Sequence, residues 1–387
     1  MHTTLNHPGA VRRVLAFVVA AAALAATHAT AAAPPSYQLT GLESMSRAND
    51  INNAGQVIGL GAVNNITQGV RWEAGIYTGL LLPANFFARG APLALNNNGL
   101  VVGTTDEVFP TGAVAWVGTT ASALPSGSTG PSLAARGVND AGTMVGTSAK
   151  LYGYDVYTER ATAWTADGHA HLLNDNFADN SGANAVTRDG LISGWVTNNT
   201  GKHAALWTDI QAAPLLLSAQ TSGANSNALS INNNGLAVGY DTDFQGYVRA
   251  TSWFFDLGRF DLGTLPGLSQ SLASDINNGG QIVGKSWSFL GTGRAVMWDG
   301  TGQMTDLNNY LSDELRDQGW VFYDAMAIND EGSIVVNGLN DRLGLQQAFL
   351  LTPVPEPGSL AMFLSGLLML VGSRRRAARR ASQEPAA

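Results

Sequence analysis

The stretch Ser274–Ser286 reads SDINNGGQIVGKS, an Asn-rich turn followed by a short apolar run. Related stretches occur at 49–59 (NDINNAGQVIG), 93–103 (LALNNNGLVVG) and 229–239 (LSINNNGLAVG). A chain that repeats one short pattern at wide intervals builds its fold from repeated supersecondary units. The recurrence of this turn therefore indicates the architecture.

The Gly of this turn recurs seven times, at spacings of 44, 43, 48, 45, 45 and 52 residues. Asn stands three residues before it in six units, and Thr187 precedes Gly190 in the fourth. Asn can bond the backbone two residues on, and Gly accepts positive φ, so N-x-x-G between apolar runs predicts a hairpin. The predicted turn residues are Asn52 and Gly55, Asn96 and Gly99, Asn139 and Gly142, Asn232 and Gly235, Asn277 and Gly280, and Asn329 and Gly332.

Two further positions repeat within each unit. The apolar run after the turn closes with a Gly that either lets the strand bend or admits a close neighbour; these are Gly59, Gly103, Gly146, Gly194, Gly239 and Gly284. An A-x-x-W segment then predicts a third strand, whose aromatic can wedge between neighbouring sheets. The aromatics are Trp72, Trp116, Trp164, Trp207, Trp253 and Trp298, and Leu351 takes their place in the seventh unit.

Four short strands in each period, with no helical periodicity, predict an all-β chain folded as a seven-bladed β-propeller. The segment 37–44 (YQLTGLES) resembles a fourth strand that lacks its first three, and 347–353 (QAFLLTP) resembles a third strand that lacks its fourth. We expect these two segments to complete one blade and close the ring. The alternative is an open β-solenoid, which would instead have distinct caps.

The N-terminal segment 1–33 has the features of a signal peptide. Arg12 and Arg13 precede an apolar run, and a small-residue zone follows. The run is short for a membrane span of ~20 residues. We therefore expect cleavage by signal peptidase, with a membrane anchor as the alternative.

The segment 354–387 contains Pro355, Glu356 and Pro357, a short apolar stretch at 358–373, and then a cluster of Arg residues. These are Arg374, Arg375, Arg376, Arg379 and Arg380. Positive charge stays cytoplasmic, which places the triplet on the outer face of the inner membrane.

This arrangement resembles the PEP-CTERM sorting signal of Gram-negative bacteria. The resemblance implies recognition by an exosortase, removal of the tail, and export to the cell surface or extracellular matrix. It also implies contact with the membrane only through the C-terminal transmembrane helix before processing. An ordinary anchor helix is the alternative.

The body, 34–353, resembles the HAF repeat of exported bacterial proteins, most closely at 261–298. The resemblance implies an extracellular, repeat-built β fold and no established reaction. Unit four departs from the pattern with VTRDG at 186–190, and unit seven lacks both the closing Gly and the Trp.

Composition and charge exclude several kinds of site and partner. The 387 residues are 45% hydrophobic, enough for a large core, and include no Cys, which excludes disulfides, thiolate metal sites and a Cys nucleophile. The two ends hold seven Arg and two Glu, so 34–353 keeps 14 basic and 27 acidic residues and a formal charge of −13. This charge argues against nucleic acid as a partner. It suits an exported protein and allows cation-bridged contact with an anionic exopolysaccharide.

Few residues are candidates for a metal-binding, sugar-binding or catalytic site. His169 and His171 share one face of a predicted strand, a spacing that can bind a metal, but a third ligand is not evident. The Asp residues in or beside the turns could form a ring of Ca²⁺ or sugar ligands, although turn chemistry is the commoner role; they are Asp50, Asp140, Asp189, Asp275 and Asp330. No nucleophile elbow, P-loop, HExxH or dinucleotide fingerprint occurs, so we expect neither an enzyme nor a cofactor.

Three functions stay open. The first is a structural or adhesive role in a biofilm or exopolysaccharide matrix, and the second is carbohydrate binding. The third is a polysaccharide hydrolase or lyase, which would need two carboxylates ~5–10 Å apart in one cleft. A carbohydrate-binding propeller would show exposed aromatics repeated around one face.

Overall fold

The computed structural model describes residues 36–82, 90–105, 112–151, 157–176, 179–217, 224–254, 258–289, 291 and 293–354. Tyr37–Pro353 form one compact unit, and the two ends of the chain form a second unit that lies almost wholly outside the described residues. The predicted signal peptide, sorting triplet and Arg cluster therefore fall outside the description. Within the described ranges, no helix is long and apolar enough to cross a membrane.

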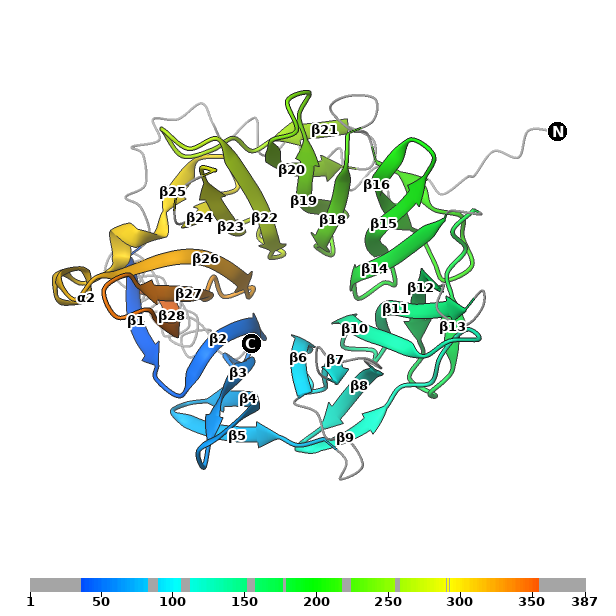
Figure 1. The fold of residues 1–387 in the computed structure, drawn as a ribbon, viewed down its shortest axis with the longest axis horizontal. Coiled ribbons are helices and arrows are strands. Elements are labelled where there is room, and N and C mark those ends of the chain that lie inside the picture. The colour runs from blue at the N-terminus through cyan, green and yellow to red at the C-terminus, as the bar shows by residue number, and fades with distance from the viewer. Residues whose placement is uncertain are drawn as a thin grey trace, which may run out of the picture. The chain divides into compact units, whose positions relative to one another are not determined.

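Tyr37–Pro353 build a seven-bladed β-propeller, with seven four-stranded antiparallel sheets arranged in a ring (Figure 1). In six blades the strands follow chain order from the axis outward. The first three of these blades comprise β2 (Met45–Ile51), β3 (Val57–Val63), β4 (Ile66–Glu73) and β5 (Ile76–Leu80); β6 (Gly90–Leu95), β7 (Val101–Thr105), β8 (Gly112–Val117) and β9 (Thr120–Ala123); and β10 (Ser132–Val138), β11 (Met144–Leu151), β12 (Tyr157–Trp164) and β13 (Ala170–Leu172).

Blades four to six repeat the same order. They comprise β14 (Asn180–Val186), β15 (Ile192–Asn198), β16 (Gly201–Trp207) and β17 (Leu215–Leu216); β18 (Ser226–Ile231), β19 (Leu236–Thr242), β20 (Val248–Phe254) and β21 (Gly258–Asp261); and β22 (Gln270–Ile276), β23 (Ile282–Trp287), β24 (Arg294–Trp298) and β25 (Met304–Asp306).

The seventh blade joins the two ends of the ring. Its strand order is β26 (Trp320–Ile328), β27 (Ile334–Asn340), β28 (Leu345–Val354) and then β1 (Ser36–Leu42). Leu39 of β1 packs against the cluster that contains Phe349 of β28, and a Cβ on Gly41 would stand 2.8 Å from Nε2 of Gln347. The prediction that the N-terminal strand closes the ring is confirmed, and the open solenoid is excluded.

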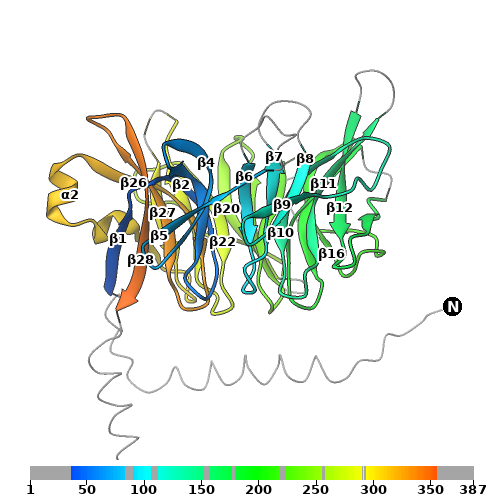
Figure 2. The same cartoon turned by 90° about the horizontal axis from the view of Figure 1, so that it is seen from below.

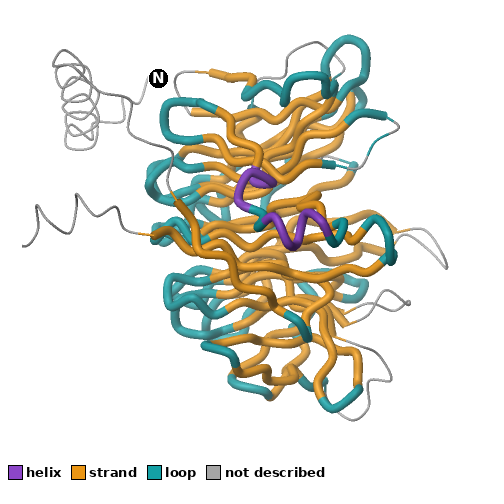
Figure 3. The backbone as a smooth tube through the Cα atoms, turned by 90° about the vertical axis from the view of Figure 1, so that its left-hand side faces the viewer, coloured by secondary structure: helices purple, strands orange, loops and turns teal. Residues whose placement is uncertain are grey.

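The 52-residue spacing before the last unit reflects an insertion. It forms the 3₁₀-helix η1 (Leu307–Tyr310) and the helix α2 (Asp313–Asp317), drawn in purple in Figure 3. Asn308 fixes η1 to the seventh blade, because its amide donates to the Phe322 carbonyl (2.9 Å) and its carbonyl accepts from the Phe322 amide (2.8 Å). The sequence analysis missed these helices, since each is too short to show a 3.6-residue period.

The repeated aromatics lie in the seams between blades. Trp116, Trp164, Trp207, Trp253 and Trp298 are fully buried. Four of their indoles donate to a carbonyl in the connection that leaves the preceding blade: Trp116 to Leu81 (3.0 Å), Trp164 to Pro125 (2.7 Å), Trp207 to Asn174 (2.6 Å) and Trp298 to Leu262 (2.8 Å). Trp72 is only half-buried, whereas Leu351, its counterpart in the seventh blade, is fully buried. In these four seams the indole therefore fills the space between blades and satisfies its own polar group.

Candidate functional site: the central channel

Each N-x-x-G turn is closed by its own Asn. In the first blade, the Asn52 backbone amide donates to the Gln56 carbonyl (3.1 Å), and the Gly55 amide donates to the Asn52 carbonyl (3.0 Å). The side-chain oxygen of Asn52 accepts from the amides of Ala54 and Gln56 (3.1 and 3.0 Å). Gly55 has φ +77°, which a residue with a Cβ rarely adopts.

The same Asn also links its blade to the next. The side-chain amide of Asn52 donates to the backbone carbonyl of Asn96, the equivalent residue of the second blade, at 3.1 Å. Five equivalent bonds run from Asn96 to Asn139, Asn139 to Thr187, Asn232 to Asn277, Asn277 to Asn329, and Asn329 to Asn52, at 2.9–3.1 Å. One residue type closes the hairpin and joins neighbouring blades, which explains why the turn recurs.

Unit four departs from this chain of bonds. Thr187 still closes its turn through its hydroxyl, which accepts from the Leu191 amide (3.0 Å), but it carries no amide to donate onward. The contact of the second turn position is kept in this unit, because the Arg188 backbone amide donates to the Asn233 side chain (2.9 Å), as the equivalent amides of Asn53 and Asn233 do in their blades.

The second turn position forms an outer circle of the same kind. The backbone amides of Asn97 and Asn278 donate to the carboxylates of Asp140 (2.8 Å) and Asp330 (2.9 Å), and the Asp330 amide donates to the Asn53 side chain (2.9 Å). Asp140 and Asp330 therefore act as acceptors between blades. The described residues contain no cluster of three or more His, Cys, Asp or Glu side chains that could hold a metal ion.

A β-bulge lies in every innermost strand, three residues before the turn Asn or Thr, as at Ala48/Asp50 in the first blade. The bulge brings a backbone carbonyl against the closing Gly of the second strand. A Cβ on Gly59 would stand 2.0 Å from the Arg47 oxygen, and one on Gly146 would stand 1.9 Å from the Ala134 oxygen. Of the two predicted roles for the closing Gly, the structure supports the close neighbour.

The bulged residues line the channel along the ring axis, and all seven blades contribute to it. We call the end that carries the N-x-x-G turns the turn end, and the end that carries the hairpins between second and third strands the hairpin end. The blades seen from the side in Figure 2 extend between these two ends. A cavity of about 310 Å³ lies toward the turn end and one of about 340 Å³ toward the hairpin end.

Two carboxyls face the turn-end cavity. Asp50 accepts from the backbone amides of Leu95 (2.7 Å) in the next blade and Ile51 (2.8 Å). Asp275 accepts from the Ile328 amide (2.9 Å) and the Ser230 hydroxyl (2.7 Å). Each Asp thus satisfies a backbone amide of the following blade at its bulge.

The surroundings of Asp50 and Asp275 raise the pKa values of both carboxyls. Burial in the channel and then the nearby Asp275 raise the pKa of Asp50 to about 8, against the opposing effect of the two backbone amides. Burial likewise raises the pKa of Asp275, although its hydrogen bonds oppose the shift. Both side chains keep part of their surface open to the channel. Asp50 therefore titrates well above the ordinary range of Asp, and the pKa of Asp275 is shifted in the same direction.

The histidines do not converge. His169 is exposed, with its Nδ1 3.6 Å from the Asp167 carboxylate, and His203 contacts the side chains of Thr200 and Asn198 (2.8 and 3.1 Å). The HAH motif therefore lies at a solvated strand of the third blade, β13, away from His203 on the fourth.

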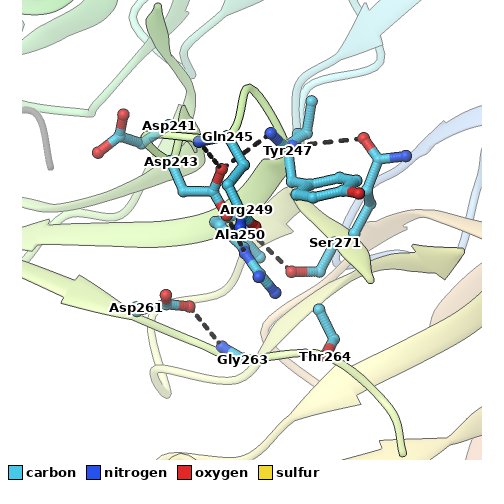
Figure 4. A network of polar contacts seen from close by, with 12 residues as sticks. Asp241, Asp243, Gln245, Tyr247, Arg249, Ala250, Asp261, Gly263, Thr264 and Ser271 are labelled. Atoms are coloured by element: carbon cyan, nitrogen blue, oxygen red, sulfur yellow. Dashed lines mark hydrogen bonds and ion pairs between the residues drawn. The ribbon is translucent and has the colours of Figure 1, made fainter. Parts of the chain in front are cut away.

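The sequence analysis missed a second use of the same turn. Asp243 replaces Asn in the hairpin between β19 and β20, and its carboxylate accepts from the amides of Gln245 (2.9 Å) and Tyr247 (3.0 Å) and from Arg249 Nε (3.2 Å), as Figure 4 shows. Burial opposes ionisation, yet these donors outweigh it and lower the pKa of Asp243. The sequence signal was D-x-x-G at 243–246.

The turn at 243–246 carries an exposed aromatic side chain. Phe244 is 77% exposed at the hairpin tip, and Phe289 in the corresponding hairpin of the sixth blade is 87% exposed. Among the described residues, the exposed aromatics Phe244, Tyr247, Phe260 and Phe289 all belong to blades five and six. These aromatics are therefore confined to two neighbouring blades and are not repeated around one face of the ring.

Comparison with known proteins identifies no family for this chain. No family model matches the chain, and no curated protein matches it. Among solved structures, dipeptidyl peptidase 4 from Porphyromonas gingivalis aligns with a TM-score of 0.41 and 8% identity, over 77% of this chain and 51% of the peptidase. The chain thus spans about half the length of that peptidase. TolB from Acinetobacter baumannii aligns with a TM-score of 0.35 and 13% identity, over 92% of this chain and 73% of TolB.

Both likenesses are too distant to carry a functional argument. The propeller assignment rests on the strand pairing of this chain itself.

Proposed function

We propose that this protein is an exported surface or matrix component of a Gram-negative bacterium, with a structural or adhesive role in a biofilm or exopolysaccharide. The observation that carries the proposal is the position of the ring's ends. The first and last strands, β1 and β28, are neighbours in one sheet. Removal of the segments outside 36–354 by signal peptidase and an exosortase therefore takes no strand from the ring.

The chemistry of the site also favours a structural and binding role over a catalytic one. Asp50 and Asp275 are the carboxyls that a sugar-cleaving reaction would use, but each of their oxygens already accepts one hydrogen bond from the blades. A glycosidase needs one carboxyl free to donate its proton and the other free to attack or to activate water. The two Asp side chains instead serve the junctions between blades.

Carbohydrate binding is the second candidate, favoured by the exposed aromatics of blades five and six. Phe244 lies in a turn that Asp243 closes, so its backbone is already ordered and its exposed ring can be offered to a ligand at a lower cost in backbone entropy. An aromatic ring of this kind stacks on the apolar face of a sugar.

Mass spectrometry of the exported protein tests the proposal. We expect a mature chain that lacks Arg374–Arg380 and is recovered in the matrix or surface fraction. Replacing Pro355, Glu356 and Pro357 with Ala should hold the protein at the inner membrane, whereas the control Pro385→Ala should not. An exported chain that still ends at Ala387 would contradict processing by an exosortase.

A further inference from the structure

We infer that the hairpin end of the central channel binds a small organic carboxylate, of the class of the sugar acids found in acidic polysaccharides. Three cationic side chains line this one cavity: Arg47 of β2, Arg136 of β10 and Lys285 of β23. Asp324 of β26 is the one carboxylate among the described residues that line it. These positive charges stand out in a body whose formal charge is −13.

The three cationic side chains differ in their contacts with carboxylates. Lys285 donates to Asp324 at 2.9 Å, so this pair is close to neutral. Arg47 and Arg136 are exposed, and neither guanidinium makes a hydrogen bond or close ion pair with another described residue, although the charge of Arg47 acts together with Lys285 on Asp324. Two guanidiniums without a directly bonded carboxylate thus line one cavity.

The cations come from the first, third and sixth blades, so they approach the axis from different sides rather than forming a flat surface patch. Between them the cavity is lined by the apolar side chains of Leu93, Leu229, Leu272 and Met326 and by the polar residues Asn49, Asn184 and Ser274. A partly enclosed cavity screens charge less than open solvent does, so it concentrates the attraction for an anion.

The opposite end of the channel is lined by more carboxyls than cations. Asp50 and Asp275 face the turn-end cavity, and Asp140 and Asp330 lie at its rim. Arg188 lies there too, 3.6 Å from Asp189, and Arg136 lines both cavities. Cations outnumber carboxyls only at the hairpin end, so we expect an anion to bind at that end.

The shape of a guanidinium and the size of the cavity restrict which ligands can bind. A guanidinium presents a planar pair of N–H donors that match a carboxylate. The volume of about 340 Å³ lies at the lower limit of small-molecule pockets and suits one sugar ring rather than a folded partner. The choice of a sugar acid among organic carboxylates rests on the proposed function in a polysaccharide matrix.

Calorimetry on the purified full-length protein tests this inference, with glucuronate, glucose and inorganic phosphate as probes. We expect glucuronate to bind, glucose not to bind, and phosphate to bind more weakly than glucuronate. Arg47→Gln and Arg136→Gln should each weaken glucuronate binding about tenfold or more. The matched control Arg188→Gln removes the same charge from the turn end and should leave the affinity unchanged.

Several results would overturn the inference: equal binding of glucose and glucuronate, tighter binding of phosphate, or an unchanged affinity in both channel variants. The thermal melt of each variant serves as the folding check, and it should stay close to that of the wild type because neither guanidinium makes a hydrogen bond or close ion pair within the described residues. Export and processing do not depend on Arg47 or Arg136. A channel that binds no anion would therefore refute this inference alone, whereas an unprocessed tail would refute the proposed function alone.

Discussion

The side-chain amide of Asn329 donates to the backbone carbonyl of Asn52 at 3.0 Å, across 277 residues of sequence. This bond joins the seventh blade to the first through the same contact that joins most other neighbouring blades. The ring is therefore closed twice, by strand β1 in the outer part of the seventh blade and by the turn Asn residues near the axis.

Removing only the inter-blade bond should weaken the ring. Asn329→Asp keeps the oxygen that closes the turn by accepting from the Ser333 amide (2.8 Å) but loses the donor to Asn52 and sets a charge against its carbonyl. We expect a loss of about 1–3 kcal/mol in the free energy of unfolding, measured by urea titration. The control Asn199→Ala changes an exposed Asn of a hairpin and should stay within about 0.5 kcal/mol. An Asp variant as stable as the control would contradict the structural role of the bond.

Deleting residues 36–44 should cost more than their share of the chain. The deletion removes strand β1, including the fully buried Leu42, and exposes the edge of β28. We expect aggregation or a much lower melting temperature, because the lost burial is comparable to a total stability of ~5–15 kcal/mol. A circular permutant that carries the segment behind residue 354 should melt like the parent, since its neighbours in space are unchanged. Equal melting of the deletion and the parent would rule out closure as a source of stability.

The closing Gly should not tolerate a methyl group. Gly146→Ala would place a Cβ 1.9 Å from the Ala134 carbonyl oxygen, so the bulge or the strand must shift. We expect a loss of about 2 kcal/mol or more, as for other overpacked interior positions. Gly112→Ala is the matched control, because its nearest neighbour, Thr105 Oγ1, would be 3.4 Å away. Comparable melting of the two variants would show that the bulge yields easily.

Stability should fall as the pH rises. In the folded protein the pKa of Asp50 is raised to about 8, so between pH 4 and 8 the native state holds a proton that the unfolded chain has lost. The contribution is therefore fully present below about pH 4 and is lost as the pH passes 8. We expect a decline of about 1–3 kcal/mol, since both side chains are partly exposed and solvent therefore screens the pair.

Asp275→Asn tests the source of that decline. An amide can still accept from the Ile328 backbone and donate to the Ser230 hydroxyl, but it removes the charge that acts on Asp50. The decline in the unfolding free energy between pH 5 and 9 should become shallower in this variant. Asp189→Asn, at an exposed carboxyl, should leave the slope unchanged. Parallel pH profiles for all three proteins would contradict coupling between Asp50 and Asp275.

The sequence by itself determined the architecture of this protein. Turn chemistry such as that of Asn277 and Gly280 is local, and its seven recurrences, together with the complementary segments at 37–44 and 347–353, were enough to predict the blade number and the closed ring. The inserted helices η1 and α2 escaped prediction because they occur once and are shorter than the periods that reveal a helix.

Only the tertiary structure decided what the repeated residues do and where the charges meet. The amide of Asn52 finds its acceptor 44 residues away, and the coupled carboxyls of Asp50 and Asp275 come from blades one and six. The cationic cavity at one end of the channel and the carboxyl-rich cavity at the other likewise combine side chains from several blades. Such contacts leave no local pattern in the chain, because they exist only where the ring brings the inner strands together around one axis.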